Sequence, residues 1–451
     1  MGRGSAARTR RAARLPASAQ YTIASLPPAL LCRVLSFVPT ESRLRCFEVC
    51  RAWRAALAPA ALWTRLDLCG IFPGRIAWKV NGLLRCAAGR SGNALASLCM
   101  DLKSGNWLTE EVLLEVLAAN AGTLRELHSV SDPHSSLDVP LLEAILRAVP
   151  QLHTFHANSL LSEDYDATRR MVCNEAPFGP LRIKVLNLGL PEAGPAAFAA
   201  LMAVLPRHAS LEKVLLIKMP LDESLDAFVD AALALKLSSV AFGFCTFTAV
   251  AVPALARLLG GGALTSLRIV RNLEFGVHAA AALAPALRAS TTLTSLTLRC
   301  VAMFRDRAHE GVQLIAALTG HVSLRELNIT DNSIGEGVAR AVGYALGMLL
   351  AVDAPALTEL DVSGCQEGGD DIMRPMLEAL AVNTHLRVLS CLYRGDGPGT
   401  MVSTELAVSV LLPSLRANTG LRELDLGFLS CFPGTALYEA RQLVAERPNG
   451  C

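Results

Sequence analysis

Apolar residues recur along this chain in one phrase that repeats from residue 95 to the C-terminus. The phrase is L-x-x-L-x-L, and other apolar residues also occupy the leucine positions; residues 264–269 (LTSLRI) and 324–329 (LRELNI) are clear copies. The twelve copies start at residues 95, 124, 152, 183, 211, 237, 264, 293, 324, 357, 386 and 421. Because the step stays between 26 and 35 residues, we interpret the pattern as an array of structural repeats.

Each repeat is predicted to contain a strand, a turn, a helix and a second turn. The last two apolar positions of the phrase alternate with the period of a strand, so both side chains enter one core. Ala- and Leu-rich stretches such as 279–287 and 338–350 follow with helical spacing. Asn272 and Asn332 lie three residues after Ile269 and Ile329, where an amide can bond the turning backbone. A second phrase, L-x-x-polar-x-x-L, leads from helix to strand at 287–293, 318–324, 380–386 and 415–421.

Consecutive strands that run the same way and are joined by helices predict a parallel sheet with right-handed crossovers. Because helices are thicker than strands, the stack is expected to bend with its sheet inside, as a horseshoe-shaped α/β solenoid. The phrases resemble leucine-rich repeats of the long, ribonuclease-inhibitor-like type over about residues 90–445. Residues 159–180 and 391–404 interrupt the pattern, and we expect them to be surface insertions.

Residues 26–68 follow a different pattern, which predicts three short helices. Pro27 and Pro28 suit a helix start, and the apolar residues of 30–38 fall on one face. A second helix is expected from about residue 41, and a short third from about 59 to 63. About forty residues are too few to build an adequate core alone. Their apolar surface is therefore expected to be covered by the adjoining repeats, by a partner protein, or by both.

This segment resembles an F-box in residues 26–39 (LPPALLCRVLSFVP), 49–54 (VCRAWR) and 62–63 (LW). Ala29 and Arg43 depart from the usual pattern, in which acids are common at these positions. The resemblance implies docking on the linker subunit of a cullin-RING ubiquitin ligase, while the repeats hold a target. Trp63 is expected to pack inward with Leu66 and Leu68. The residues implied to face the linker subunit are Leu26, Pro27, Leu30, Leu31, Val34, Leu35, Cys50 and Trp53.

Residues between the buried strand positions are expected to point outward on the inner face of the horseshoe, where a target would bind. They are basic in the middle repeats and acidic in the later ones. This arrangement favours a partner with separated, complementary charges, although ordinary solubilising charge explains it equally well. The candidate residues are Lys213, Lys218, Arg268, Arg271, Arg299, Glu326, Glu359, Asp361, Glu423 and Asp425.

These patterns divide the chain into a disordered basic tail (1–20), an F-box-like helical module (21–68), a linker with a first-repeat cap (69–94) and the repeats (95–451). Forty-two basic and forty acidic residues and 5% aromatic residues argue against a nucleic-acid partner. The thirteen cysteines include no CxxC pair and indicate reduced thiols in the cytoplasm, the nucleus or both. Residues 237–256 carry no charge, but they fall in register with the repeats, so we expect no membrane span.

The sequence contains no complete motif of a known catalytic, cofactor or metal site. His153 and His156 are three apart on a strand and would face opposite sides, and the acids of 361–371 lack the last ligand of a calcium loop. We therefore expect no cofactor, no metal and no catalysis. The resemblance to an F-box followed by leucine-rich repeats implies a substrate-recognition subunit of a cullin-RING (SCF-type) ubiquitin ligase that binds the linker subunit and cullin. The alternative is a leucine-rich-repeat scaffold, an inhibitor or a small-GTPase regulator whose N-terminal helices only cap the array.

Overall fold

The structure is a computed structural model of the chain. It describes residues 26–38, 40–46, 49–68, 80–100, 109–129, 137–152, 154–157, 160–178, 182–304, 308–334, 336–352, 356–365, 369–392, 402–427 and 433–447. The predicted tail (1–20), residues 69–79 of the predicted linker, His153 and most of 391–404 lie outside these ranges. The chain forms two compact units, with residues 1–130 and 148–155 in unit 1 and residues 131–147 and 156–451 in unit 2.

Unit 1 joins three short helices to the first strands of a parallel ladder. Strands β1, β2 and β3 are parallel neighbours, and Leu66, Leu98 and Leu127 occupy equivalent positions in them. Strand β1 lies within the segment that resembles an F-box, so that segment supplies the first strand of the ladder. The elements are α1 (Pro28–Ser36), α2 (Thr40–Cys46), α3 (Arg51–Ala56), η2 (Ala60–Trp63), β1 (Arg65–Asp67), α5 (Val80–Arg90), β2 (Ser97–Met100), α6 (Glu110–Ala119) and β3 (Glu126–Ser129).

Unit 2 contains an eleven-stranded sheet in the order β16-β15-β14-β13-β12-β11-β10-β9-β8-β6-β4. Every strand pair with a described register in this sheet is parallel. The strands are β4 (Leu137–Asp138), β6 (Leu160–Ser162), β8 (Val185–Leu188), β9 (Lys213–Ile217), β10 (Ser239–Gly243), β11 (Ser266–Val270), β12 (Ser295–Arg299), β13 (Glu326–Asn328), β14 (Glu359–Asp361), β15 (Val388–Ser390) and β16 (Glu423–Asp425). Short strands β5 (Thr154–Ala157) and β7 (Arg182–Ile183) pair with each other.

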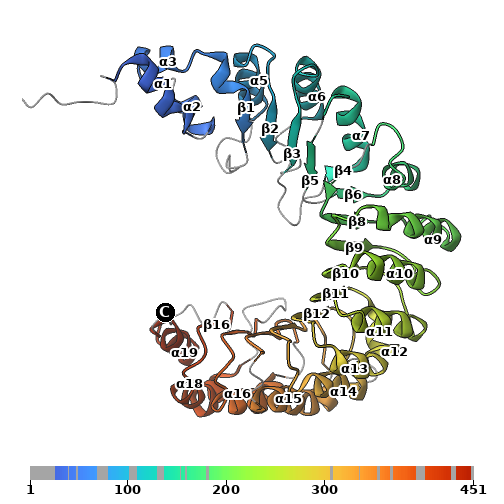
Figure 1. Cartoon of the computed structure of the whole chain (residues 1–451). Helices are drawn as coiled ribbons and strands as arrows, with labels where there is room; N and C mark the ends of the chain where they lie inside the picture. The colour runs from blue at the N-terminus through green and yellow to red at the C-terminus, as the bar shows by residue number, and fades with distance from the viewer. Residues whose placement is uncertain are drawn as a thin grey trace, which may run out of the picture. The chain divides into compact units, whose positions relative to one another are not determined.

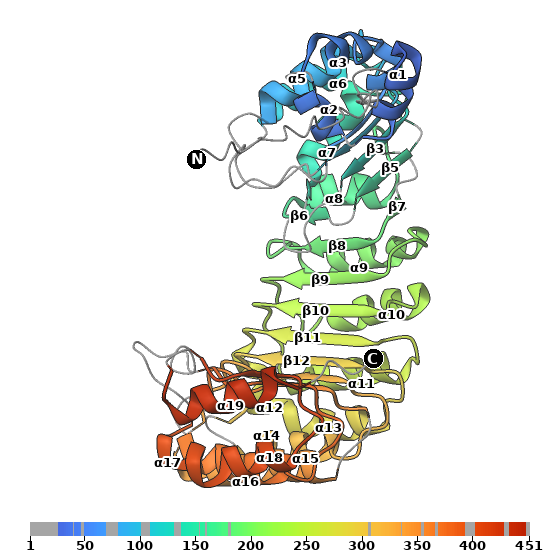
Figure 2. The ribbon, with the colours of Figure 1, turned by 90° about the vertical axis from the view of Figure 1, so that its left-hand side faces the viewer.

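The helices of unit 2 lie on one side of this sheet, and the strands line the other side (Figure 1). Figure 2 shows the strands β8 to β12 stacked in the same direction. The helices are α7 (Val139–Ala148), α8 (Tyr165–Val172), α9 (Pro195–Val204), α10 (Leu225–Leu235), α11 (Val252–Gly260), α12 (Leu273–His278), α13 (Ala280–Ala289), α14 (Ala308–Leu318), α15 (Glu336–Ala351), α16 (Gly369–Leu380), α17 (Thr404–Leu406), α18 (Leu412–Ala417) and α19 (Ala436–Ala445), with short helical turns at 205–207, 249–251 and 407–411. The predicted α/β leucine-rich-repeat architecture is confirmed. We call the side of the unit 2 sheet opposite these helices the inner face.

The alternation of apolar residues sets the register of the sheet. Leu267 and Ile269 are buried, whereas Arg268 between them is exposed, and the neighbouring strands repeat this arrangement. Residues 237–256 follow the same rule, with β10 followed by the start of α11. Buried rings pack edge to face here: Phe242 meets Phe247 at 5.4 Å between centroids, and Phe247 meets Phe275 of α12 at 5.7 Å. Among the described residues, no helix is long and apolar enough to span a bilayer.

The predicted insertion at 159–180 is wrong, because this stretch contains the strand and helix of a repeat. Strand β6 pairs with β8 in the main sheet, and α8 follows it. The second inward position of β6 is Ser162, which is buried and hydrogen-bonded to the Thr168 hydroxyl. A polar residue at an inward position hides the strand from a search for apolar alternation.

Buried polar side chains connect successive repeats. Asn332 donates from its amide to the carbonyls of Leu298 (2.7 Å) and Ile329 (2.8 Å), which confirms the predicted backbone contacts. The middle residue of the second phrase acts in the same way. Asn383 donates to the Leu350 carbonyl of the preceding repeat (2.9 Å) and accepts from the Leu386 N–H (2.8 Å).

We expect Asn383→Ala to lower the free energy of unfolding by about 2 kcal/mol, because it leaves a buried carbonyl and a buried N–H without partners. Ser290→Ala is the matched control at the same position of another repeat. The Ser290 hydroxyl is buried and has no hydrogen-bond partner within the described part of the chain. Its removal should change stability by less than about 0.5 kcal/mol. Urea unfolding of both variants checks this, and equal losses would contradict the bridging role of the amide.

Candidate binding surfaces

Helix α1 presents two different apolar faces. The helix begins at Pro28 with Pro27 as its N-cap, as the two prolines predict. Leu31 and Leu35 are 1% exposed, and α1 packs against α3. Leu30 and Val34, each one residue earlier, are 51% and 44% exposed. The helix therefore uses one stripe to build unit 1 and leaves the other uncovered.

Of the residues predicted to face a linker subunit, six are accessible to some degree and two are not. Leu31 and Leu35 require a correction, because they lie inside unit 1 and support the uncovered stripe from beneath. The accessible ones are Leu26, Cys50 and Trp53, which are half-buried, and Pro27, Leu30 and Val34, which are exposed.

Two large apolar side chains extend this surface and were not among the predicted site residues. Phe37 is 81% exposed and Val49 is 60% exposed. Phe37 lies seven positions after Leu30, on the same side of a helix, which is the signal that could have identified it. We call Leu30, Val34, Phe37 and Val49 the apolar surface of unit 1.

Arg43 has an internal role in unit 1. It donates to the carbonyls of Val38 (2.9 Å) and Leu62 and to the Thr40 hydroxyl, which ties α2 to η2. Burial lowers the pKa of this guanidinium, although it remains charged at neutral pH. The residue that departs from the usual F-box pattern at this position therefore takes part in packing inside unit 1 and adds no charge to the apolar surface.

Eight of the ten predicted target-binding residues occupy outward strand positions on the inner face of unit 2, Lys218 and Arg271 lie at its edge in the turns directly after β9 and β11, and none of the ten is buried. Lys213, Lys218, Arg268, Arg271, Glu326, Glu359, Glu423 and Asp425 are exposed, and Arg299 and Asp361 are half-buried. The strand register aligns the eight strand residues in rows that run across the strands. One row passes through Lys213, Ser239, Ser266, Ser295, Glu326, Glu359, Val388 and Glu423.

A row of left-handed residues follows the strands β9 to β13. Lys218, Phe244, Arg271, Cys300 and Asp331 all have φ between 53° and 58°. They occur at the repeat spacing, so one turn geometry recurs in successive repeats. This turn places Phe244, which is 49% exposed, beside Arg271, whose guanidinium lies 5.1 Å from the ring centroid. Sequence reasoning identified Arg271 but missed Phe244, because backbone geometry exposes that ring.

The acidic part of the inner face lies on β13 to β16. Glu326 and Glu359 are direct cross-strand neighbours. Partial loss of hydration, together with the charges of Glu326 and Glu423, raises the pKa of Glu359 above its usual value. Asp361 accepts from the Asn328 amide (3.3 Å) and from the Ser363 N–H (3.0 Å), so its carboxylate is held in place.

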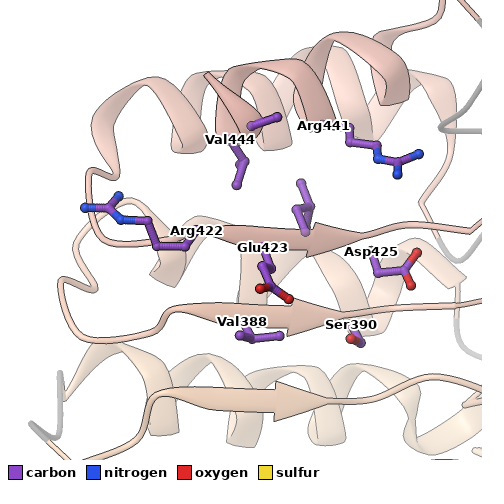
Figure 3. A pocket seen from close by; sticks show the side chains of 9 residues that line it. Val388, Ser390, Arg422, Glu423, Asp425, Arg441 and Val444 are labelled. Carbon is purple, nitrogen blue, oxygen red and sulfur yellow. The ribbon is translucent and has the colours of Figure 1, made fainter. Parts of the chain in front are cut away.

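A pocket of about 340 Å³ lies at the end of this acidic part, beside α19. Figure 3 shows Glu423 and Asp425 projecting from β16, with Val388 and Ser390 on the neighbouring strand β15 and Arg441 and Val444 across the opening on α19. The pocket is lined by both signs of charge, so it offers places for a cationic and an anionic group of a partner.

The described residues contain no group of three or more His, Cys, Asp and Glu side chains that could hold a metal ion. Burial raises the pKa of Cys245 to about 11 and that of Cys365 to about 12. Both side chains are therefore neutral thiols at pH 7, unlike activated nucleophiles. The features with a binding chemistry in these residues are the apolar surface of unit 1 and the charged inner face of unit 2.

Comparisons with known proteins agree with the sequence resemblance in the N-terminal segment. Residues 23–69 match the F-box-like family. The human F-box only protein 17 is 47% identical over 51 residues, which are 11% of this chain and 18% of that protein. The human F-box only protein 27 is 48% identical over 59 residues, 12% of this chain and 21% of that protein. The chain thus spans about a fifth of the length of these curated relatives.

Among solved structures, the leucine-rich-repeat protein LegL7 of Legionella pneumophila is 17% identical, with a TM-score of 0.35, over 60% of this chain and 83% of that one. A chain of the yeast Rad7 and Elc1 complex is 14% identical, with a TM-score of 0.34, over 83% of this chain and 96% of its own length. Likenesses at this level carry no argument about function. The F-box-like identification of the N-terminal segment is confirmed by the family match and the two relatives.

Proposed function

We propose that this protein is a non-catalytic substrate-recognition subunit of a cullin-RING (SCF-type) ubiquitin ligase. Its F-box-like segment would dock on the linker subunit, and its repeats would hold the target protein. The observation that carries the proposal is the apolar surface of unit 1, because it lies on the segment that matches the F-box-like family.

Exposed apolar area of this kind is costly in water and is typical of protein interaction sites. Leu30, Val34 and Phe37 follow one another at steps of four and three, so they offer a stripe along α1 and its C-terminal end. Insertion of such a stripe into an apolar site of a partner removes its apolar area from water, and each Å² removed stabilises the complex by about 25 cal/mol. The adjoining residues of α1 are already buried, which leaves the stripe fixed in position before docking.

A purely capping role for the N-terminal helices is the competing interpretation. Strand β1 and the buried Trp63 do connect these helices to the ladder, as a cap requires. A cap needs only its buried faces, however, and gains nothing from Leu30, Val34 and Phe37 at the surface. The uncovered stripe therefore favours the adaptor proposal.

The test is co-expression of the full chain with the linker subunit of a cullin-RING ligase. The parent chain should form a stable complex, and Leu30→Glu with Val34→Glu should weaken it by about 100-fold, because two carboxylates would be buried without partners. The matched control is Val250→Glu with Val322→Glu, two exposed valines of unit 2. Affinity is measured by surface plasmon resonance, and thermal unfolding checks the fold. If the Leu30 and Val34 variant binds as tightly as the parent, the adaptor proposal is wrong.

A further inference from the structure

The charges on the inner face of unit 2 are segregated by sign. The outward strand positions of β9 to β12 include Lys213, Arg268 and Arg299 and no acid, whereas those of β13 to β16 include five acids and no base. Charges that serve only solubility are usually mixed in sign, because a large field of one sign promotes unwanted association. The segregation therefore calls for a specific explanation.

The basic half combines free cations with an aromatic ring. Lys218 and Arg268 form no ion pair with any of the described residues, so both are available to a partner. Arg271 is held over the exposed ring of Phe244, which leaves donors of its guanidinium for other acceptors. Arg299 donates to the Asp331 carboxylate at 2.7 Å, and this pair marks the boundary between the two halves. A carboxylate-rich segment with apolar groups matches this half.

The acidic half complements the basic half along the same rows. Glu326, Glu359 and Glu423 occupy equivalent positions, and partial loss of hydration together with these like charges raises the pKa of the Glu359 carboxyl. A partner cation placed between them would relieve this repulsion. In the basic half, the half-buried residues Leu215, Ala241 and Val270 separate the basic side chains, so that half also offers apolar contact.

We propose that the inner face of unit 2 binds an extended polypeptide segment in which acidic residues are separated from basic residues by a fixed distance. The centres of the two halves are four strands apart, which is about 19 Å at ~4.8 Å per strand. An extended chain covers that distance in about six residues at ~3.3 Å each. The segment crosses the strands with its acidic part on β9 to β12 and its basic part on β13 to β16. Its role as the recognition element of a ubiquitination target rests on the function proposed above.

Synthetic nine-residue peptides test this charge order directly. One has three glutamates, three serines and three lysines in that order, a second has the reverse order, and a third alternates the same residues. We expect the full chain to bind at least one separated-charge peptide tenfold or more tightly than the alternating peptide, measured by fluorescence anisotropy at low salt. Equal affinities for all three peptides would overturn the proposal.

Variants then assign the two halves. Lys218→Glu, Arg268→Glu and Arg271→Glu together should weaken the preferred peptide at least tenfold. Reversal of Arg207, Arg288 and Arg374, which are exposed outside the inner face, alters the net charge equally and should change affinity less than twofold. When Glu326→Lys, Glu359→Lys and Glu423→Lys are added to the basic-half variant, the preference between the two peptide orders should be reversed. An unchanged preference contradicts the charge complementarity.

Linker-subunit binding by the same variants separates this inference from the proposed function. Because the inner-face substitutions lie in unit 2, they should leave the complex with the linker subunit intact. Loss of peptide binding with an intact linker complex supports the inference. If the chain binds the peptide but never binds the linker subunit, the charge recognition is supported and its role in ubiquitin transfer is contradicted. An intact linker complex without any peptide preference removes the inference alone.

Discussion

Gly343→Val together with Gly347→Val should lower the free energy of unfolding of unit 2 by about 4 kcal/mol, at about 1–3 kcal/mol for each overpacked site. The two glycines lie one turn apart on α15, where the backbone of α16 approaches closely. A Cβ on Gly343 would lie 2.6 Å from the Asp371 carbonyl oxygen, and one on Gly347 would lie 2.8 Å from that of Pro375. Both obstacles are backbone atoms, so no side-chain rotation relieves the clash.

A proline lies inside α16 where the two helices approach each other. Pro375 has no N–H, so the Asp371 carbonyl four residues earlier lacks its usual helical partner. Gly343 leaves room for that carbonyl against α15, where Cα–H groups offer weak hydrogen bonds. We therefore infer that Pro375 and Gly343 depend on each other, and that a side chain at residue 343 forces the two helices apart.

Gly337→Ala is the matched control, because it lies in the same helix and a Cβ there meets nothing within 4 Å. Its stability should stay the same or rise by up to about 1 kcal/mol, from the better helix propensity of alanine. Since long repeat arrays can unfold in parts, hydrogen exchange of α15 and α16 should accompany urea unfolding. If the valine pair leaves both measurements unchanged, the two helices do not require the glycines.

The repeats could be predicted from sequence because their packing depends on residue type and period alone. Leu267 and Ile269 face the core, and apolar residues take the same two positions in most other repeats, so their alternation identifies the strand. The stretch around β6 was missed because Ser162 takes the place of the second apolar residue. A hydroxyl pair with Thr168 satisfies that serine, and this contact cannot be read from the sequence.

The apolar surface of unit 1 was predicted only in part, for a geometric reason. Leu30 and Leu31, like Val34 and Leu35, are neighbours in the sequence but point about 100° apart on a helix. The pattern shows that this helix is apolar on a broad side, but it does not show which part of that side packs on α3. In the same way, the left-handed turn after β10 exposes Phe244, a position where an aromatic residue would otherwise be expected to be buried.

Trp63→Ala should lower the free energy of unfolding of unit 1 by about 3–5 kcal/mol, as expected for the loss of a fully buried large side chain. Trp63 is 0% exposed and donates from its indole nitrogen to the Leu57 carbonyl at 2.8 Å. The guanidinium groups of Arg43 and Arg90 each lie 5.6 Å from its ring centroid. One side chain thus contacts α2, through Arg43, and α5, through Arg90, and it joins the F-box-like helices to the first repeat.

Two further variants separate the contributions of volume and hydrogen bonding at this site. Trp63→Phe keeps an aromatic ring but leaves the buried Leu57 carbonyl without its donor, so a loss of about 1–2 kcal/mol is expected. Trp53→Ala removes the same type of side chain from a half-buried site on α3 and should cost less than Trp63→Ala. Thermal and urea unfolding of all three variants give the order, with Trp63→Ala the most destabilised. If Trp53→Ala is equally destabilised, Trp63 is not the residue that couples the helices to the ladder, and the stability of the apolar surface depends on the packing of α3 instead.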